Sequence, residues 1–150
     1  LVLTRQGVPH QARSDEQVAA IARGGYVLID CDGPPDVLLI ATGSEVGLVA
    51  GAADALAGEG VKVRVVSMPS TDVFDAQEDD YRESVMPAAV TARVAVEAGV
   101  TECWWRFAGP QGRVIGVDRF GESAPAGELF EHYGLTVDHV VAAARDVLGS

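Results

Sequence analysis

The chain has 150 residues, of which 48% are hydrophobic and 22% are charged, and its formal net charge is −11 at pH 7 with a pI near 4.5. This length and composition suit one domain with a genuine hydrophobic core. The acidic balance argues against binding nucleic acid or an anionic membrane through bulk electrostatics. No apolar run approaches the roughly 18 residues that a membrane span needs.

Two isolated cysteines, Cys31 and Cys103, lack the spacing of a metal site or a disulfide framework. They are typical of reduced thiols in a cytoplasmic protein. The chain begins with Leu1 rather than Met and opens on a short apolar run at residues 1–3. We therefore expect it to be a piece of a longer polypeptide.

The segment before residue 34 predicts one short helix and one strand. Ser14 and Gln17 have the spacing of a capping box, which predicts a helix as far as about Ala22. The glycines at 24 and 25 end that helix, and residues 26–30 form a strand candidate at a sheet edge. A turn cluster at residues 32–36, which contains two prolines, marks the boundary of the principal domain at residues 34–150.

The rest of the chain is organised around residues 37–46. Five consecutive apolar residues, 37–41, predict a strand that is covered on both faces. Thr42-Gly43-Ser44 breaks the run, and residues 46–56 then place apolar side chains on one helical face. Ser44 is the expected N-cap, with its hydroxyl accepting from a first-turn N–H group. Glu45 lies where a carboxylate is favoured by the helix dipole.

Strand and helix candidates alternate from there to the C-terminus. Strands are expected at residues 61–67, 91–97 and 114–117, a short helix around Trp104 and Trp105, and helices after Pro125 and at 137–148. Pro125 is expected at the first helical position. The fold class is therefore α/β, with three α/β/α layers around a mostly parallel, mixed sheet of about five strands.

An acidic stretch at residues 72–83 contains six carboxylates and one arginine. A calcium loop would need a turn glycine at defined spacing, which is missing here. We interpret the stretch as one solvated acidic helix. His10, His132 and His139 do not pair at metal-ligand spacing, and neither Ser44 nor Ser123 lies in a nucleophile-elbow motif.

Two places remain where the sequence suggests binding. The turn at residues 42–45 can gather free N–H groups at a helix start, although it has one glycine, no lysine and the charge of Glu45. Arg5 follows an apolar run in a chain that has few cations. A guanidinium at a strand end can hold a phosphate or carboxylate through two hydrogen bonds.

Seven stretches, taken together and in order, resemble the C-terminal part of transketolase. The turn at 42–44 alone is also similar to deoxyxylulose-phosphate synthases and 2-oxoacid dehydrogenases, but the Arg-Gly-Gly-Tyr-Val and Gly-Glu-Ser-Ala-Pro segments favour transketolase. The seven stretches are residues 3–6 (LTRQ), 21–28 (IARGGYVL), 41–46 (ATGSEV), 65–70 (VVSMPS), 81–85 (YRESV), 93–98 (RVAVEA) and 120–125 (FGESAP).

The resemblance implies the third domain of a homodimeric enzyme that uses thiamine diphosphate and a divalent metal, Mg or Ca, in the pentose phosphate pathway. It implies that residues 1–33 are the tail of the preceding pyrimidine-binding domain, a linker and an edge strand. The cofactor and its metal would bind the first two domains, so neither a catalytic residue nor a cofactor or metal ligand is expected in this chain. The arginine that contacts the substrate sugar phosphate in the family falls on Arg5. The family's fold has one antiparallel strand, expected at residues 26–29 or in the last strand.

Three hypotheses about the function follow. The first is a structural, dimer-supporting transketolase domain that supplies Arg5 and is inactive alone, with sugar phosphates, the other domains and a second subunit as partners. The second is a free-standing module that binds a small anion at residues 42–45. The third is a purely interactive domain with Trp104 and Trp105 in a subunit interface.

Overall fold

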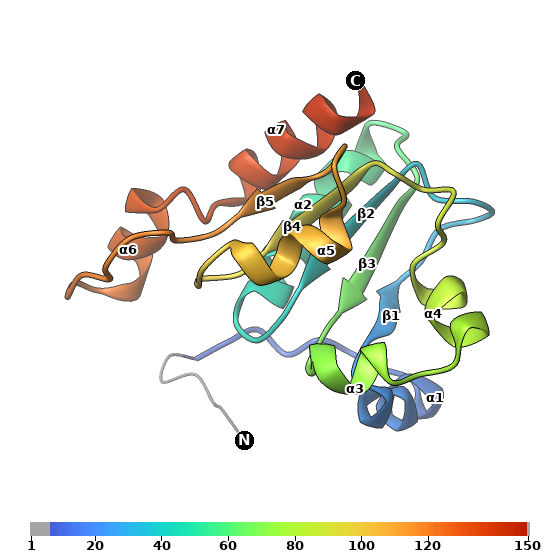
Figure 1. Cartoon of the computed structure of the whole chain (residues 1–150). Helices are drawn as coiled ribbons and strands as arrows, with labels where there is room; N and C mark the ends of the chain where they lie inside the picture. Colours follow the sequence, from blue (N-terminus) through green and yellow to red (C-terminus); the bar gives the residue numbers. More distant parts are fainter. Residues whose placement is uncertain (1–6, 150) are drawn as a thin grey trace.

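The computed structural model describes residues 7–149 as a five-stranded sheet with helices on both faces (Figure 1). Among these residues no helix combines the length and the apolar character that crossing a membrane would take. The strands are β1 (Tyr26–Ile29), β2 (Val37–Ala41), β3 (Val63–Ser67), β4 (Arg93–Val96) and β5 (Arg113–Ile115). The helices are α1 (Asp15–Ala20), α2 (Glu45–Gly58), α3 (Thr71–Asp75), α4 (Asp79–Val85), α5 (Trp105–Ala108), α6 (Ala126–His132) and α7 (Val137–Leu148), with 3₁₀ turns η1 (Ile21–Arg23) and η2 (Glu102–Trp104).

The strands lie in the order β1-β3-β2-β4-β5, with β2 at the centre. β2 runs parallel to both neighbours, so that Leu39 lies beside Val65 of β3 and Val94 of β4. β1 pairs antiparallel with β3 at one edge. This confirms the predicted α/β class with a mixed, mostly parallel sheet, and the antiparallel strand is the first of the two expected alternatives.

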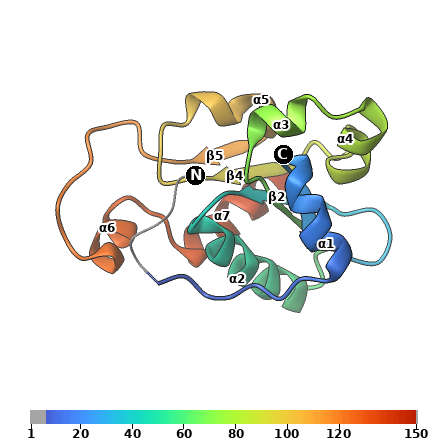
Figure 2. The same cartoon turned by 90° about the horizontal axis from the view of Figure 1, so that it is seen from below.

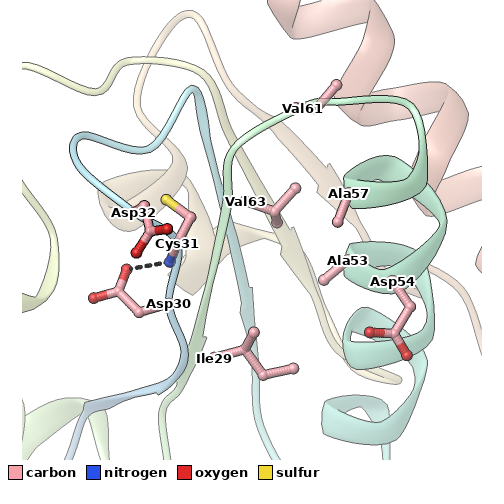
Figure 3. Close-up of a pocket in the computed structure, with 9 residues that line it drawn as sticks. All are labelled: Ile29, Asp30, Cys31, Asp32, Ala53, Asp54, Ala57, Val61 and Val63. Atoms are coloured by element: carbon pink, nitrogen blue, oxygen red, sulfur yellow. Dashed lines mark hydrogen bonds between the residues drawn. The ribbon is translucent and has the colours of Figure 1, made fainter.

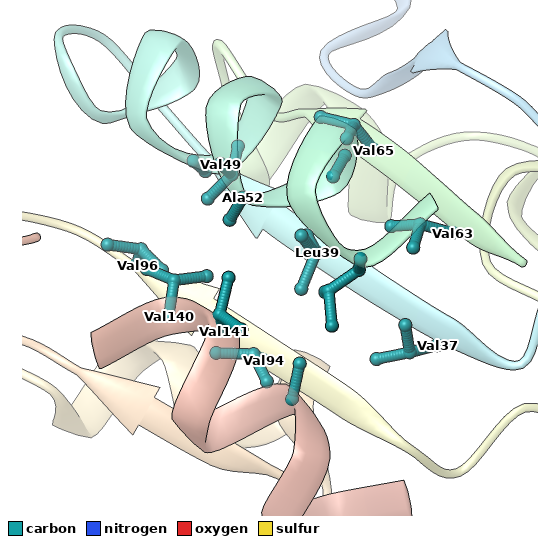
Figure 4. Packing of buried hydrophobic residues seen from close by; sticks show 14 of the residues in the cluster. Val37, Leu39, Val49, Ala52, Val63, Val65, Val94, Val96, Val140 and Val141 are labelled. Atoms are coloured by element: carbon teal, nitrogen blue, oxygen red, sulfur yellow. The ribbon is translucent and has the colours of Figure 1, made fainter. Parts of the chain in front are cut away.

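Every residue of β2 is buried, and its alternating side chains serve two separate cores. Val37 and Leu39 face α2 and α7, where Val49 and Val140 are completely buried (Figure 4). Leu38 and Ile40 belong to the second cluster, which includes side chains from α3, α4 and α5; the list is Val66, Met68, Phe74, Val85, Met86, Val90, Ala95, Trp104, Phe107 and Ala108. Figure 2 shows α2 and α7 on one side of the sheet and α3, α4 and α5 on the other.

Local signals in the sequence explain the helix ends. The capping box is present in full: Ser14 Oγ accepts from Gln17 N, and the Gln17 side chain accepts from Ser14 N. Thr136 caps α7 by accepting from His139 N at 3.2 Å. Gly24 takes a left-handed φ of 84°, and a Cβ there would lie 2.5 Å from the backbone of Phe74, so only glycine fits.

The acidic segment was predicted as one helix, and that prediction is wrong. Two helices form, α3 and α4, with Ala76 closing the first and Glu78 opening the second. Phe74 is buried in the core, and the Tyr81 hydroxyl donates to Gly25 O at 2.8 Å. Both aromatic side chains pack against the second core cluster, so the segment is not a purely solvated surface helix.

Residues 116–133, here called the arm, leave the sheet after β5 and comprise a loop at 116–125 and helix α6. No residue of α6 is buried, and both views place α6 apart from the sheet (Figures 1 and 2). Pro125 takes the N-cap position rather than the first helical position that we expected. Its φ of −53° and extended ψ of 141° explain the one-residue difference, because the helical conformation begins only at Ala126.

The base of the arm is tied to the loop after β4. Thr101 donates to Asp118 twice, from its backbone N–H and from its hydroxyl, both at 2.8 Å. These two donors, the N–H first, hold the pKa of the Asp118 carboxyl below its ordinary value. The bonds between Thr101 and Asp118 therefore contribute fully to stability above about pH 3.9, the ordinary pKa of an aspartate. Their contribution is lost as the pH falls through the lower pKa that Asp118 has in the folded chain.

We predict that Thr101→Val, which removes the hydroxyl donor, raises the Asp118 pKa toward about 3.9. Thr101→Ser keeps the donor and should leave the pKa lowered. A carboxyl-carbon NMR titration of the three chains measures this directly. Equal pKa values in Thr101→Val and Thr101→Ser would show that the hydroxyl does not act on Asp118.

Candidate functional site at the carboxyl edge of the sheet

The carboxyl ends of β2, β3 and β4 open onto a hollow of about 1060 Å³. Its walls come from the turn after β2, the residues that follow β3 and β4, and residues 8–13 of the N-terminal segment. The chain leaves β2 for β3 on one side and later returns to β4 on the other side. Ligands of open α/β sheets bind outside the carboxyl ends of the strands at such a switch point. This hollow is therefore the candidate site.

Helix α2 begins at the hollow. The prediction that the Ser44 hydroxyl caps this helix by accepting a hydrogen bond is wrong. Ser44 is the N-cap residue, yet its side chain makes no cap hydrogen bond. Its hydroxyl donates instead to Glu45 Oε1 at 2.6 Å. Ser44 itself is helical, with φ −67° and ψ −27°, whereas a capping residue takes an extended conformation. Gly43, with a φ of 55°, provides the left-handed residue that turns the chain from β2 into α2.

Glu45 is the buried charged side chain of this turn, with only 3% of its surface exposed. Its Oε2 accepts from the backbone N–H of Ala98 at 3.2 Å and thereby joins the start of α2 to the end of β4. The neighbouring Glu97 accepts from the indole N–H of Trp104. A carboxylate thus already lies at the helix start, where the dipole favours a negative charge. This arrangement works against a second anion at residues 42–45.

The N-terminal segment covers part of the hollow and contributes a cation that the sequence pattern did not single out. Arg13 donates from Nε to the Tyr26 hydroxyl at 2.6 Å and from Nη1 to Gln11 O at 2.7 Å. Pro9 lies over the first turn of α2, 3.5 Å from where a Cβ on Gly47 would be. No motif marks Arg13, because its side-chain partner Tyr26 is brought to it only by the fold.

All nine arginines among residues 7–149 have partners within the domain. Arg93 is partly buried, and desolvation lowers its pKa, while its guanidinium donates to three backbone carbonyls. The other partners are Tyr26 for Arg13, Gln77 for Arg23, Asp30 for Arg64, Asp79 for Arg82, Asp75 for Arg106, Asp146 for Arg113, His132 for Arg119 and Glu59 for Arg145.

A second pocket, of about 460 Å³, lies near the start of β3 and contains the thiol of Cys31 (Figure 3). Burial, and then the charge of Asp30, raise the pKa of this thiol. A raised pKa leaves little of the reactive thiolate at neutral pH. Asp30, Asp32 and Asp54 line the same pocket, so it does not suit an anionic sugar phosphate.

The fit to a cofactor or metal can be tested on the described residues. Within residues 7–149 no three His, Cys, Asp or Glu side chains come together in a way that could hold a metal ion. His139 Nδ1 donates to Gly134 O, and His132 lies beside Glu122. Trp104 is buried in the core, whereas Trp105 is 45% exposed. Arg5, the predicted substrate-binding residue, lies outside the described residues, and its role stays a prediction.

The comparisons with known proteins identify the family of this α/β domain. The family described as "Transketolase-like TK C-terminal domain" matches residues 24–136. The chain belongs to this transketolase C-terminal domain family. It is 59% identical over 148 residues to transketolase 1 of Escherichia coli K12, a match that covers 99% of this chain and 22% of that protein. The chain thus spans about a fifth of the length of the curated relatives it matches.

Solved transketolase structures share the fold. The transketolase of Leishmania mexicana superimposes with a TM-score of 0.88 at 40% identity, over 97% of this chain and 20% of that one. A structure titled "Split gene transketolase, inactive beta4 tetramer" matches with a TM-score of 0.69 at 29% identity, over 97% of this chain and 48% of that one. These findings confirm the family and the fold that the sequence motifs indicated.

The tie between Glu45 and Ala98 yields a stability prediction. Glu45→Ala removes two hydrogen bonds and leaves the Ala98 N–H without its acceptor, so we expect a loss of about 1–3 kcal/mol in the free energy of unfolding. Glu128→Ala, on the exposed surface of α6, should change that free energy by less than about 0.5 kcal/mol. Urea denaturation of the three chains measures both values. Equal stabilities of the two variants would contradict the structural role of Glu45.

Proposed function

We propose that this chain acts as the C-terminal domain of a complete, cytoplasmic transketolase. Such an enzyme transfers a two-carbon ketol unit from a ketose phosphate, such as xylulose 5-phosphate, to an aldose phosphate, such as ribose 5-phosphate. The observation that carries the proposal is the 59% identity over 148 residues to a transketolase. The domain's part is structural and dimer-supporting, and it supplies a substrate-binding arginine.

The proposal assigns thiamine diphosphate and its Mg or Ca ion to other domains of the enzyme. The described residues offer no ligand set for the metal, so we derive no catalytic step through the cofactor here. Residues 1–33 would be the tail of the preceding domain, a linker and an edge strand, and residues 34–150 the C-terminal domain proper. The partners would then be the other domains of the polypeptide and a second subunit.

Arg5 is the residue that we propose contacts the substrate phosphate. The nine described arginines are each engaged within the domain, and a phosphate bound to one of them would displace its present partner. A guanidinium that meets a sugar phosphate makes two charged hydrogen bonds at a point remote from the reacting carbons. Such a contact is equally strong in the ground state and the transition state, so it lowers KM without raising kcat.

The first test is activity. The purified 150-residue chain, supplied with thiamine diphosphate and Mg²⁺, should show no ketol transfer from xylulose 5-phosphate to ribose 5-phosphate, because the cofactor would bind elsewhere. The full polypeptide that contains this chain should turn over under the same conditions. Turnover by the 150 residues alone, or an inactive full polypeptide, would contradict the proposal.

The second test is Arg5→Ala in the full polypeptide, with ribose 5-phosphate and ribose compared as acceptors. Loss of charged hydrogen bonds predicts a KM for ribose 5-phosphate that is roughly 10- to 100-fold higher at nearly unchanged kcat, and no change for ribose. Arg145→Ala is the matched control, since Arg145 pairs with Glu59 and does not line the hollow, and it should not discriminate between the acceptors. Equal losses on both acceptors in Arg5→Ala would assign Arg5 a structural role instead.

A further inference from the structure

One ring nitrogen in the arm faces two side chains that make opposite demands on it. His132, the last residue of α6, has its Nε2 atom 2.9 Å from Arg119 Nη2 and 3.4 Å from Glu122 Oε1. Both partners come from the loop at 116–125. A guanidinium group can only donate hydrogen bonds, whereas an ionised carboxylate can only accept them. A single nitrogen atom cannot satisfy both partners at once, so a proton on Nε2 decides which of them is bonded.

The structure holds the arrangement of the neutral ring. The 2.9 Å separation is that of a hydrogen bond, and because the arginine is the donor, Nε2 accepts and the ring proton lies on Nδ1. The same guanidinium lies over the Tyr133 ring, 4.8 Å from its centre. The Tyr133 hydroxyl in turn donates to Phe120 O at 3.3 Å. Arg119 therefore fastens the loop to the end of α6 as long as His132 is uncharged.

The charged groups on α6 itself do not bond to the imidazole. They are Glu128, one helical turn before His132, and Glu131, the preceding residue. The Tyr133 ring meets the imidazole edge-on, with 5.0 Å between the ring centres. Within residues 7–149 the imidazole has no hydrogen-bonded or ion-paired partner besides the arginine and the glutamate of the loop. The choice of partner is therefore made on the loop side of the ring.

We propose that the arm contains a pH-operated switch in which protonation of His132 exchanges Arg119 for Glu122. A proton taken from solvent at Nε2 removes the lone pair that accepts from Arg119. It also puts two positive charges at hydrogen-bond distance, where they repel each other. The new N–H group can donate to the Glu122 carboxylate, as a bond between opposite charges. Histidine is the side chain that ordinarily changes charge between about pH 5 and 8, so the switch works near neutral pH and needs no ligand.

The exchange acts on an exposed part of the surface. Phe120 follows Arg119 directly, and its side chain is 97% exposed. When Arg119 is released and Glu122 binds the ring, the loop around Phe120 is held at a different residue. The base of the arm stays fixed, because the bonds from Thr101 to Asp118 are lost only below about pH 3.9. The conformational change is thus confined to the outer part of the arm.

NMR spectroscopy of the 150-residue chain at about pH 8 and about pH 5 tests the switch. At the higher pH the imidazole nitrogen shifts should place the proton on Nδ1, and the Tyr133 ring should shift the Cδ protons of Arg119 upfield. At the lower pH both ring nitrogens should carry protons. The upfield shift should then be lost, because the Tyr133 ring lies beside the charged imidazole. A proton on Nε2 at the higher pH, or an Arg119 shift that is the same at both pH values, would overturn the proposal.

Two histidine variants identify the group that titrates. His132→Gln cannot gain a charge and should abolish the pH response of Arg119. His139→Gln, which removes the histidine of α7, should keep that response. Unchanged amide shifts in the sheet show that both variants are folded. A response that survives in His132→Gln would assign the change to another group and refute the switch.

Two glutamate variants test the second partner. Glu122→Gln removes the charge that binds the protonated ring, so at about pH 6 it should reduce the fraction of chains with a displaced Arg119 about twofold. Glu131→Gln removes a carboxylate that does not bond to the ring and should leave that fraction unchanged. Equal effects of the two substitutions would mean that the general charge of the arm, rather than the contact with Glu122, favours the protonated ring, and the proposed exchange of partners would be wrong.

Discussion

The burial of β2 on both faces is the constraint on which the rest of the structure depends. A strand with five buried residues needs an apolar layer above and below it and a hydrogen-bonding strand on each side. α2 and α7 supply one layer, and α3, α4 and α5 supply the other. The chain must therefore cross over the sheet twice around β2. Those crossovers bring the ends of β2, β3 and β4 to one edge and create the hollow there.

The same constraint determines what that edge can do. Because α2 starts directly after a buried strand, Glu45 is buried with it, and its carboxylate needs donors. It finds them in Ser44 and in the backbone of Ala98. The helix start is thereby occupied by a charge of the protein's own, and the turn serves to join β2 to β4. A position that binds phosphate at this edge in other α/β folds is used here for stability.

Sequence patterns could predict the elements whose causes are local. The capping box of Ser14 and the buried run at 37–41 depend on neighbours within four residues, and both are present. The break between α3 and α4, the role of the Ser44 hydroxyl and the contact between Arg13 and Tyr26 depend on partners that only the fold brings near. The motifs of the family identified the domain, yet no periodicity distinguished which edge strand is antiparallel.

The distribution of charge is compatible with the proposed role of this acidic domain in an enzyme of anionic substrates. At physiological ionic strength a charge is screened beyond about 8 Å, so the net charge of −11 has little effect on a phosphate bound at a distance. Groups close to a phosphate determine whether it binds. Within residues 7–149 the arginines already contact carboxylates, carbonyls and aromatic rings. Under the proposed function, a substrate phosphate would therefore be bound by a residue other than these nine arginines.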